Sequence, residues 1–194
     1  MWWDTQATPQ GVFGVPEDDY QLFTDRQTEF ILDTLEPWKN DRIGDIGCGI
    51  GRLLAAMRSR QSDLQLVGVD PSPRMLAQAA LVAPPLTLIR NEDGREIHGM
   101  PRLNGAYSVL TFQHVVDSTV ALILSDVAEA LWIRSKFVAQ WLIGAPDNTG
   151  PMSYPRTVEQ IESLLFTTGF SDVEFVPDWN VTRYSEEWVW TVAR

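Results

Sequence analysis

The chain has 194 residues, with 26 acidic and 15 basic side chains and a formal net charge of -11 at pH 7. Apolar residues make up 44% of it, which is typical of a globular domain and excludes collagen-like and largely disordered classes. The acidic balance argues against a protein that holds nucleic acid or an anionic membrane by long-range charge. No apolar run approaches the ~20 residues of a membrane-spanning helix, and no secretory signal opens the chain, so we expect a soluble, cytoplasmic protein.

Cysteine and histidine are too scarce for several common kinds of site. The single cysteine, Cys48, excludes an internal disulfide and a cysteine-based zinc site. The only two histidines, His98 and His114, do not have metal-ligand spacing. We therefore expect no metal.

Residues 1–40 differ in character from the rest of the chain. Aromatic residues are interspersed with glycine and proline up to Pro16, and residues 18–35 have the apolar spacing of one or two amphipathic helices. Pro37 ends the helical pattern. We interpret residues 1–40 as an N-terminal helical cap on a domain formed by residues 41–194. The cap is expected to act as a lid over a ligand, the alternative being a permanently docked helix that completes the core.

From residue 42 onward, short apolar strands alternate with helices. The expected strands are 42–46, 64–69, 86–89, 106–110, 136–142, 172–176 and 187–192, and the expected helices are 52–60, 73–81, 121–132 and 157–168. Ser72 is expected to cap the second of these helices. Alternating strands and helices predict a mostly parallel sheet with helices on both faces. The last two strands have no helix between them, which predicts an antiparallel pair at one edge.

The strongest local signal is a glycine-rich turn, Ile-Gly-Asp-Ile-Gly-Cys-Gly-Ile-Gly-Arg at residues 43–52. Gly47, Gly49 and Gly51 let the backbone turn sharply between a strand and a helix and approach a ligand closely. Asp70 ends the next strand, where an acid accepts hydrogen bonds from both ribose hydroxyls of an adenosine. A tight turn with a helix-capping aspartate is the structural alternative, but the succession of strand, glycines, helix, strand and acid favours a nucleotide-like ligand.

The details of the turn argue against a dinucleotide. The dinucleotide fingerprint needs a small residue at position 52, which is Arg52 here. Asp45 at the strand tip would repel a pyrophosphate at the helix N-terminus but suits a positively charged ammonium group. An adenosine joined to an amino acid satisfies both acids, Asp70 at the ribose and Asp45 at the amino end.

With these features the chain resembles the class I S-adenosylmethionine-dependent methyltransferases over about residues 41–194. The resemblance rests on residues 45–51 and 66–76, and then on 91–94, 106–115 and the Gly169-Phe170 ending. It implies a Rossmann-like α/β fold: a seven-stranded, mostly parallel sheet of order 3-2-1-4-5-7-6, with strand 7 antiparallel and helices on both faces. One departure is the turn before the fifth strand, residues 132–136, which is not glycine-rich.

The resemblance implies S-adenosylmethionine as the cofactor and assigns residues to it. The expected cofactor residues are Asp45, Gly47, Cys48, Gly49, Gly51, Asp70, Pro71, Met75, Asp93, Gly94 and Thr111, with Tyr20 from the N-terminal segment. Glu92 is the alternative to Asp93 at the adenine amino group.

Catalytic and substrate residues are less sharply marked. His114 follows the fourth strand and is the candidate general base; the alternative is that it caps or packs the following helix and only shapes the cofactor floor. The loop at residues 144–154 has the composition of a binding loop. Trp141, Tyr154 and Arg156 around it are the substrate candidates.

We expect methyl transfer by in-line displacement to a small-molecule acceptor. A nucleic-acid amino methyltransferase would place an Asp/Asn/Ser-Pro-Pro-aromatic run after the fourth strand, where residues 111–114 read Thr-Phe-Gln-His. A protein methyltransferase remains an alternative, as does a protein that binds the cofactor without transferring methyl, such as a sensor or a partner-activating subunit. The sequence carries no expectation for the oligomeric state.

Overall fold

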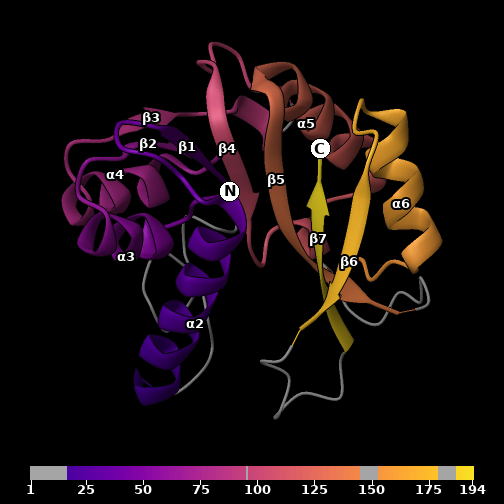
Figure 1. Ribbon diagram of the computed structural model, residues 1–194, viewed down its shortest axis with the longest axis horizontal. Coiled ribbons are helices and arrows are strands. Elements are labelled where there is room, and N and C mark those ends of the chain that lie inside the picture. Colours follow the sequence, from indigo (N-terminus) through magenta and orange to yellow (C-terminus); the bar gives the residue numbers. More distant parts are fainter. Residues whose placement is uncertain (1–16, 95, 145–152, 179–186) are drawn as a thin grey trace.

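The computed structural model describes residues 17–94, 96–144, 153–178 and 187–194, and its seven strands form one sheet of order β3-β2-β1-β4-β5-β7-β6 (Figure 1). The strands are β1 (Arg42–Ile46), β2 (Gln65–Val69), β3 (Thr87–Ile89), β4 (Leu103–Ser108), β5 (Leu131–Ile143), β6 (Val173–Pro177) and β7 (Glu187–Ala193). Strands β1 to β5 pair in parallel, while β7 is antiparallel to both β5 and β6. The predicted fold class and strand order are confirmed.

The helices cover both faces of the sheet. They are α2 (Glu17–Leu35), α3 (Arg52–Arg60), α4 (Pro73–Val82), α5 (Asp117–Ala130) and α6 (Val158–Thr167), with short 3-10 turns η2 (Glu92–Gly94) and η3 (Phe112–His114). Because successive strand residues point to opposite faces, side chains of the sheet contribute to two apolar clusters, one on each face. Tyr107 packs with α2, α3 and α4, whereas its neighbour Ala106 packs with α5 and α6. Ser72 caps α4 as predicted, its side chain accepting a hydrogen bond from the Met75 N–H.

The fifth strand begins earlier than predicted. Strand β5 starts at Leu131, directly after α5, where the pattern indicated helix to residue 132 and strand only from 136. Leu131 pairs with Leu103 before the register shifts, so this first part of β5 projects past the core and leaves Ile133 95% exposed. Arg134 has φ 70°, the left-handed conformation that a glycine usually supplies in such a turn.

The N-terminal segment contributes one helix, α2, to the described residues, which lies against the sheet beside α3 (Figure 1). Ile31 is fully buried, and the Phe30 ring lies 4.8 Å from that of Trp190. Lys136 Nζ donates to the Thr34 carbonyl at 2.6 Å. The C-terminal half of α2 is thus part of the core, while residues 1–16 lie outside the described residues. None of the described helices is long and apolar enough to cross a membrane.

Candidate functional site

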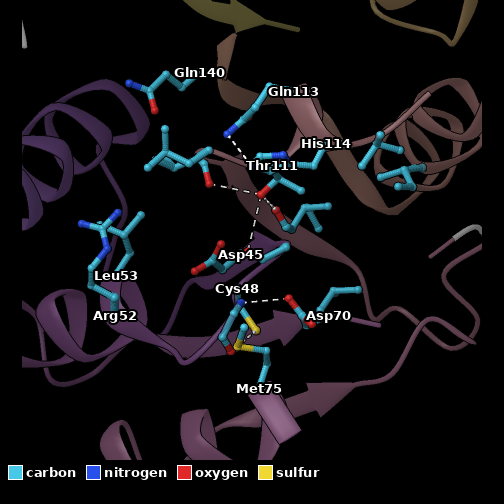
Figure 2. A pocket seen from close by; sticks show the side chains of 18 of the residues that line it. Asp45, Cys48, Arg52, Leu53, Asp70, Met75, Thr111, Gln113, His114 and Gln140 are labelled. Carbon is cyan, nitrogen blue, oxygen red and sulfur yellow. Dashed lines mark hydrogen bonds between the residues drawn. The ribbon is translucent and has the colours of Figure 1, made fainter. Parts of the chain in front are cut away.

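A cavity of about 580 Å³ opens at the carboxyl ends of the central strands. Its walls come from the turns that follow β1, β2 and β4, together with parts of α2, β5 and β7. Figure 2 shows Asp70 and Met75 at one end, Gln113 and Gln140 at the other, and Asp45 between them. In an open α/β sheet this edge is where ligands bind.

The glycine turn forms the floor of the cavity. The N–H groups of Gly47 and Cys48 both donate to the Val69 carbonyl, which ties the turn to β2. Gly47 and Gly49 have φ of 81° and 53°. A Cβ at Gly47 would overlap the Thr111 side chain, but a Cβ at Gly49 would meet no protein atom within 4 Å. Gly49 therefore offers bare backbone to a ligand, while Gly47 is required by the fold.

Asp70 lies where β2 ends, beside this turn. Its Oδ2 accepts from the Gly49 N–H at 3.0 Å, and its Oδ1 accepts from the Ser72 N–H at 2.8 Å. The carboxylate is buried and lines the cavity. It is thus held in a fixed orientation next to the glycine that is open to a ligand. An acid in this place can accept hydrogen bonds from ribose hydroxyls.

Asp45 is the second acid of the site and is only 2% exposed. Burial raises the pKa of its carboxyl to about 7, although the hydrogen bond from Tyr107 and the charge of Arg52 lower it. The Tyr107 hydroxyl lies 3.0 Å from Asp45 Oδ2. A cationic ligand group at this point would draw the carboxyl into its charged form.

The cavity wall beside η2 contains one residue, Asn91, to which the sequence had assigned no role. Asn91 is buried and lines the cavity with Gly94, and its Oδ1 has no hydrogen-bond partner among the described residues. A carbonyl oxygen in this state suits an amino group of a ligand. The side chain of Asp93, which was expected here, lies outside the described residues.

Two expected cofactor residues act at a distance from the cavity wall. Gly51, with φ 81°, lets α3 pack against α4, because a Cβ there would come within 2.9 Å of Ala79. The Tyr20 ring lies beneath the Arg52 guanidinium, whose Cζ atom is 5.7 Å from the ring centroid. Later residues of the same helix, Phe23 and Gln27, line the cavity in its place. The remaining cofactor candidates do line it: Asp45, Gly47, Cys48, Gly49, Asp70, Pro71, Met75, Gly94 and Thr111.

Arg52 links the glycine turn to the N-terminal helix. Its guanidinium donates to Thr24 Oγ1 at 2.9 Å and to Gln27 Oε1 at 2.8 Å, and the residue lines the cavity. In the sequence, Arg52 stands out only as a departure from the dinucleotide fingerprint. Arg52 can connect α3 to α2 through these hydrogen bonds because it lies in the first turn of α3.

His114 ends η3 and lines the cavity, as expected for a residue that faces a substrate. Its Nε2 pairs with Gln113 Nε2 at 3.1 Å. An amide nitrogen only donates, so this pairing places the acceptor lone pair of the imidazole on Nε2 and its proton on Nδ1. The geometry brings both side chains to the far end of the cavity from Asp70.

The three substrate candidates do not line the cavity. Trp141 faces the opposite side of the sheet, where its ring stacks on Phe112 at 4.7 Å and its Nε1 donates to Thr191. Tyr154 is exposed on the outer surface, and only its backbone N–H reaches the site, donating to the Gln113 carbonyl. The expectation failed for Trp141 because adjacent strand residues point to opposite faces.

Arg156 is buried beneath the η3 turn rather than on the rim of the cavity. Its Nε donates to Asp117 Oδ1 and its Nη1 to the Phe112 carbonyl, both at 2.8 Å. A further hydrogen bond reaches the Val115 carbonyl. Arg156 thus holds the turn that carries His114. The loop that was expected to bind substrate falls largely on residues 145–152, outside the described residues.

Four other residues form the far end of the cavity and were not expected from the sequence. They are Gln113, Gln140, Asp178 and Trp188. Gln140 directly precedes Trp141, so the alternation of β5 that removes the tryptophan brings the glutamine in. The available signal was one polar residue, the glutamine, within the otherwise apolar run of residues 137–143.

Comparison with known proteins agrees with this architecture. The family described as "Methyltransferase domain" matches residues 43–132. A curated O-methyltransferase of Pyrenophora dematioidea is 25% identical over 178 residues, covering 83% of this chain and 66% of that protein. The chain thus spans just under two thirds of the length of this relative.

Solved structures give the same fold. One is phosphoethanolamine N-methyltransferase 2 of Haemonchus contortus, in complex with phosphomonomethylethanolamine and S-adenosylhomocysteine; it has a TM-score of 0.73 at 21% identity, covering 97% of this chain and 58% of that one. Another is the magnesium protoporphyrin IX methyltransferase of Synechocystis with bound S-adenosylmethionine, with a TM-score of 0.65 at 16% identity, covering 91% and 81%. With the strand order, the glycine turn and the acid after β2, these matches show that the chain has the fold of the class I S-adenosylmethionine-dependent methyltransferases and resembles them in sequence.

Proposed function

We propose that the protein binds S-adenosylmethionine in this cavity and catalyses methyl transfer to a small-molecule acceptor. The observation that carries the proposal is one continuous cavity with two different ends. One end has an open glycine, Gly49, next to an oriented acid, Asp70. The other end extends to His114 and Gln140 and leaves room for a second molecule.

The described residues fit the cofactor part by part. Asp70 faces the space for the ribose, and the unpartnered Asn91 Oδ1 suits the adenine amino group. Asp45 supplies negative charge for the amino-acid ammonium group. The backbone at Gly49 leaves space for close approach. Bound in this way, S-adenosylmethionine supplies a methyl group already activated on a sulfonium sulfur.

The chain itself orients the acceptor molecule and receives the proton that the acceptor loses. The cavity walls hold the acceptor so that its lone pair forms a bond to the methyl carbon as the carbon–sulfur bond breaks, with the bonding pair remaining on sulfur. The acceptor atom then gives up its proton, and His114, at the same end of the cavity, is the group placed to receive it at Nε2 when the substrate takes the place of the Gln113 amide at that atom. Orientation is worth up to ~7–11 kcal/mol in the best cases, and a base adds ~10²–10⁴-fold.

The test is turnover of methyl-labelled S-adenosylmethionine against a panel of amines, phenols and carboxylic acids, with S-adenosylhomocysteine as the measured product. The matched control is Asp70→Asn, which keeps the shape of the side chain but removes the charge; it should weaken cofactor binding by about tenfold or more, since a hydrogen bond to a charged group is worth ~1.5–3 kcal/mol. Cofactor binding without turnover on any acceptor class would favour a binding protein. A wild-type protein that binds neither cofactor nor product would refute the proposal.

A further inference from the structure

The far end of the cavity has its own hydrogen-bonding character. Gln140 and Gln113 are 4% and 6% exposed, and both line the cavity. The Oε1 atom of each has no hydrogen-bond partner among the described residues. A buried polar atom without a partner is costly, so such atoms are normally satisfied by water or by a ligand.

The Gln140 amide has a defined orientation. Its Nε2 donates to Asp178 Oδ2, and a carboxylate can only accept. The nitrogen must therefore face Asp178, which leaves the oxygen for the cavity. Figure 2 shows both Gln140 and Gln113 toward the end of the cavity away from Asp70.

The Gln113 amide presents the same atom when His114 is the tautomer with its proton on Nδ1. Its nitrogen pairs with His114 Nε2, so its oxygen is the group that remains. Two glutamines from different elements, η3 and β5, thus contribute acceptors to one space.

Other side chains at this end of the cavity also favour a ligand that donates hydrogen bonds or carries positive charge. Asp178 lines this end and is an acceptor only, while Trp188 offers an aromatic face that attracts cations. The arginine on the described wall, Arg52, is bonded to Thr24 and Gln27 of α2. Figure 2 draws it away from both glutamines. A carboxylate or phosphate at the far end would face these two glutamine oxygens and the negative charge of Asp178.

We infer that this end of the cavity recognises an acceptor molecule through N–H or O–H donors, and that the acceptor is uncharged or cationic there and carries no anionic group. The inference rests on the proposed function, because it names the substrate class for the same site. Gln140 and Gln113 would then be specificity-determining residues, receiving hydrogen bonds from the amine or hydroxyl that enters.

The binding experiment uses three probes with one phenyl frame: phenethylamine, phenethyl alcohol and hydrocinnamate. Each is titrated into wild-type protein saturated with S-adenosylhomocysteine and followed by ligand-observed NMR. The amine and the alcohol should bind, and hydrocinnamate should bind about tenfold more weakly or worse, which corresponds to ~1.4 kcal/mol of preference. The tighter of the two donors assigns the acceptor as an amine or a hydroxyl.

The variant Gln140→Met keeps the length of the side chain and removes its acceptor. It should bind S-adenosylhomocysteine as the wild type does but bind the donor probes more weakly, because one of the two acceptor oxygens is gone. The inference is overturned if hydrocinnamate binds as well as the donors, if neither donor binds at millimolar concentration, or if Gln140→Met binds both donors as tightly as the wild type does. A wild-type protein that fails to bind S-adenosylhomocysteine would instead overturn the proposed function.

A stability measurement without ligand gives an independent readout. Gln113→Met removes an unpartnered buried oxygen together with the hydrogen bond to His114, so its denaturation midpoint should fall less than that of a variant that loses only a satisfied hydrogen bond. Gln160→Met is the matched control, because Gln160 Oε1 accepts from the Thr157 N–H in the capping box of α6, and its midpoint should fall. A fall for Gln113→Met as large as that of the control would show that the Gln113 oxygen is already satisfied and would contradict the inference.

Discussion

The Tyr107 hydroxyl donates a hydrogen bond to Asp45 Oδ2 at 3.0 Å; both side chains are buried, and Asp45 lines the cavity. Without a counter-charge in contact, burial dominates over this hydrogen bond and raises the Asp45 pKa to about 7. The carboxyl therefore titrates near neutrality, next to the place where an ammonium group of the cofactor would bind. Two predictions concern this pair.

The first is a pH dependence of stability. The folded-state pKa of Asp45 lies above its ordinary value of 3.8, so the folded protein holds the proton more tightly than the unfolded chain. Its contribution to the unfolding free energy is full below pH 3.8 and is lost as pH rises through about 7, by ~1.4 kcal/mol for each unit of pKa separation. Urea unfolding between pH 5 and 8 should show wild type losing stability relative to Asp45→Asn; parallel curves would refute the shifted pKa.

The second prediction is proton release on ligand binding. An ammonium group near Asp45 favours the charged carboxylate, so the pKa should fall when S-adenosylhomocysteine binds, and affinity should increase as pH rises toward 7. Calorimetry at pH 6.5 in two buffers of different ionisation enthalpy measures the released proton. Asp45→Asn should bind with no buffer dependence from this group. Identical enthalpies in both buffers for the wild type would place the ammonium group away from Asp45.

Most of the residues that the sequence assigned to the cofactor do line the cavity, because glycines mark the positions where the backbone must turn sharply. Positive φ at Gly47 and Gly49, and the acid after β2, are local properties of short motifs. The same locality explains the strand order, since alternating strands and helices permit few topologies. The sheet order 3-2-1-4-5-7-6 came from the family resemblance and from the missing helix before β7.

The acceptor end was harder to predict, because side chains from distant elements meet there. Choosing Trp141 over Gln140 required the register of β5, and one residue of error exchanges the two faces of the sheet. Arg156 is predicted from the sequence to lie on the rim of the cavity. Its actual partners, Asp117 and a carbonyl of η3, lie about forty residues away in sequence, so the local pattern does not indicate them. A pattern along the chain does not show such long-range pairs.

The two glycines of the turn should separate folding from binding. Gly49→Ala places its methyl in open space and costs only the ~1–2 kcal/mol of a left-handed conformation, yet it should reduce S-adenosylhomocysteine affinity because the methyl occupies ligand space. Gly47→Ala should lose more stability, because its methyl overlaps Thr111. Thermal unfolding and calorimetry on both variants test this. Wild-type affinity in Gly49→Ala would show that no ligand approaches that backbone.

Arg156 should matter for stability more than for cofactor binding. Arg156→Lys keeps the charge but loses the planar set of donors that reaches Asp117 and the carbonyls of Phe112 and Val115, so we expect a loss of about 1–3 kcal/mol in unfolding free energy. Asp117→Asn is the control, with an expected change of less than about 1 kcal/mol because that carboxylate is more than half exposed. Affinity for S-adenosylhomocysteine should change little in both. A loss of affinity without a loss of stability in Arg156→Lys would restore this residue to the binding site.

The last prediction concerns the N-terminal helix, which we propose is a scaffold in its second half and a lid in its first. Residues 28–35 are held by the buried Ile31, by Phe30 against Trp190 and by Lys136 on the Thr34 carbonyl. The first half contacts the site through Phe23 and Gln27, which line the cavity, and through Arg52, which donates to Thr24 and Gln27. A ligand that touches these side chains should therefore slow the opening of the first half alone.

Amide hydrogen exchange with and without S-adenosylhomocysteine distinguishes the two halves. Peptides covering residues 19–27 should gain protection when the ligand binds, whereas those covering 28–35 should be strongly protected in both states. Arg52→Met should weaken the gain in residues 19–27, because it removes the hydrogen bonds that connect α3 to Thr24 and Gln27. Peptides from α6 serve as the internal control, since Ile161 and Leu165 pack on the opposite face of the sheet. Equal protection of residues 19–27 in both states would make the whole of α2 a fixed part of the core.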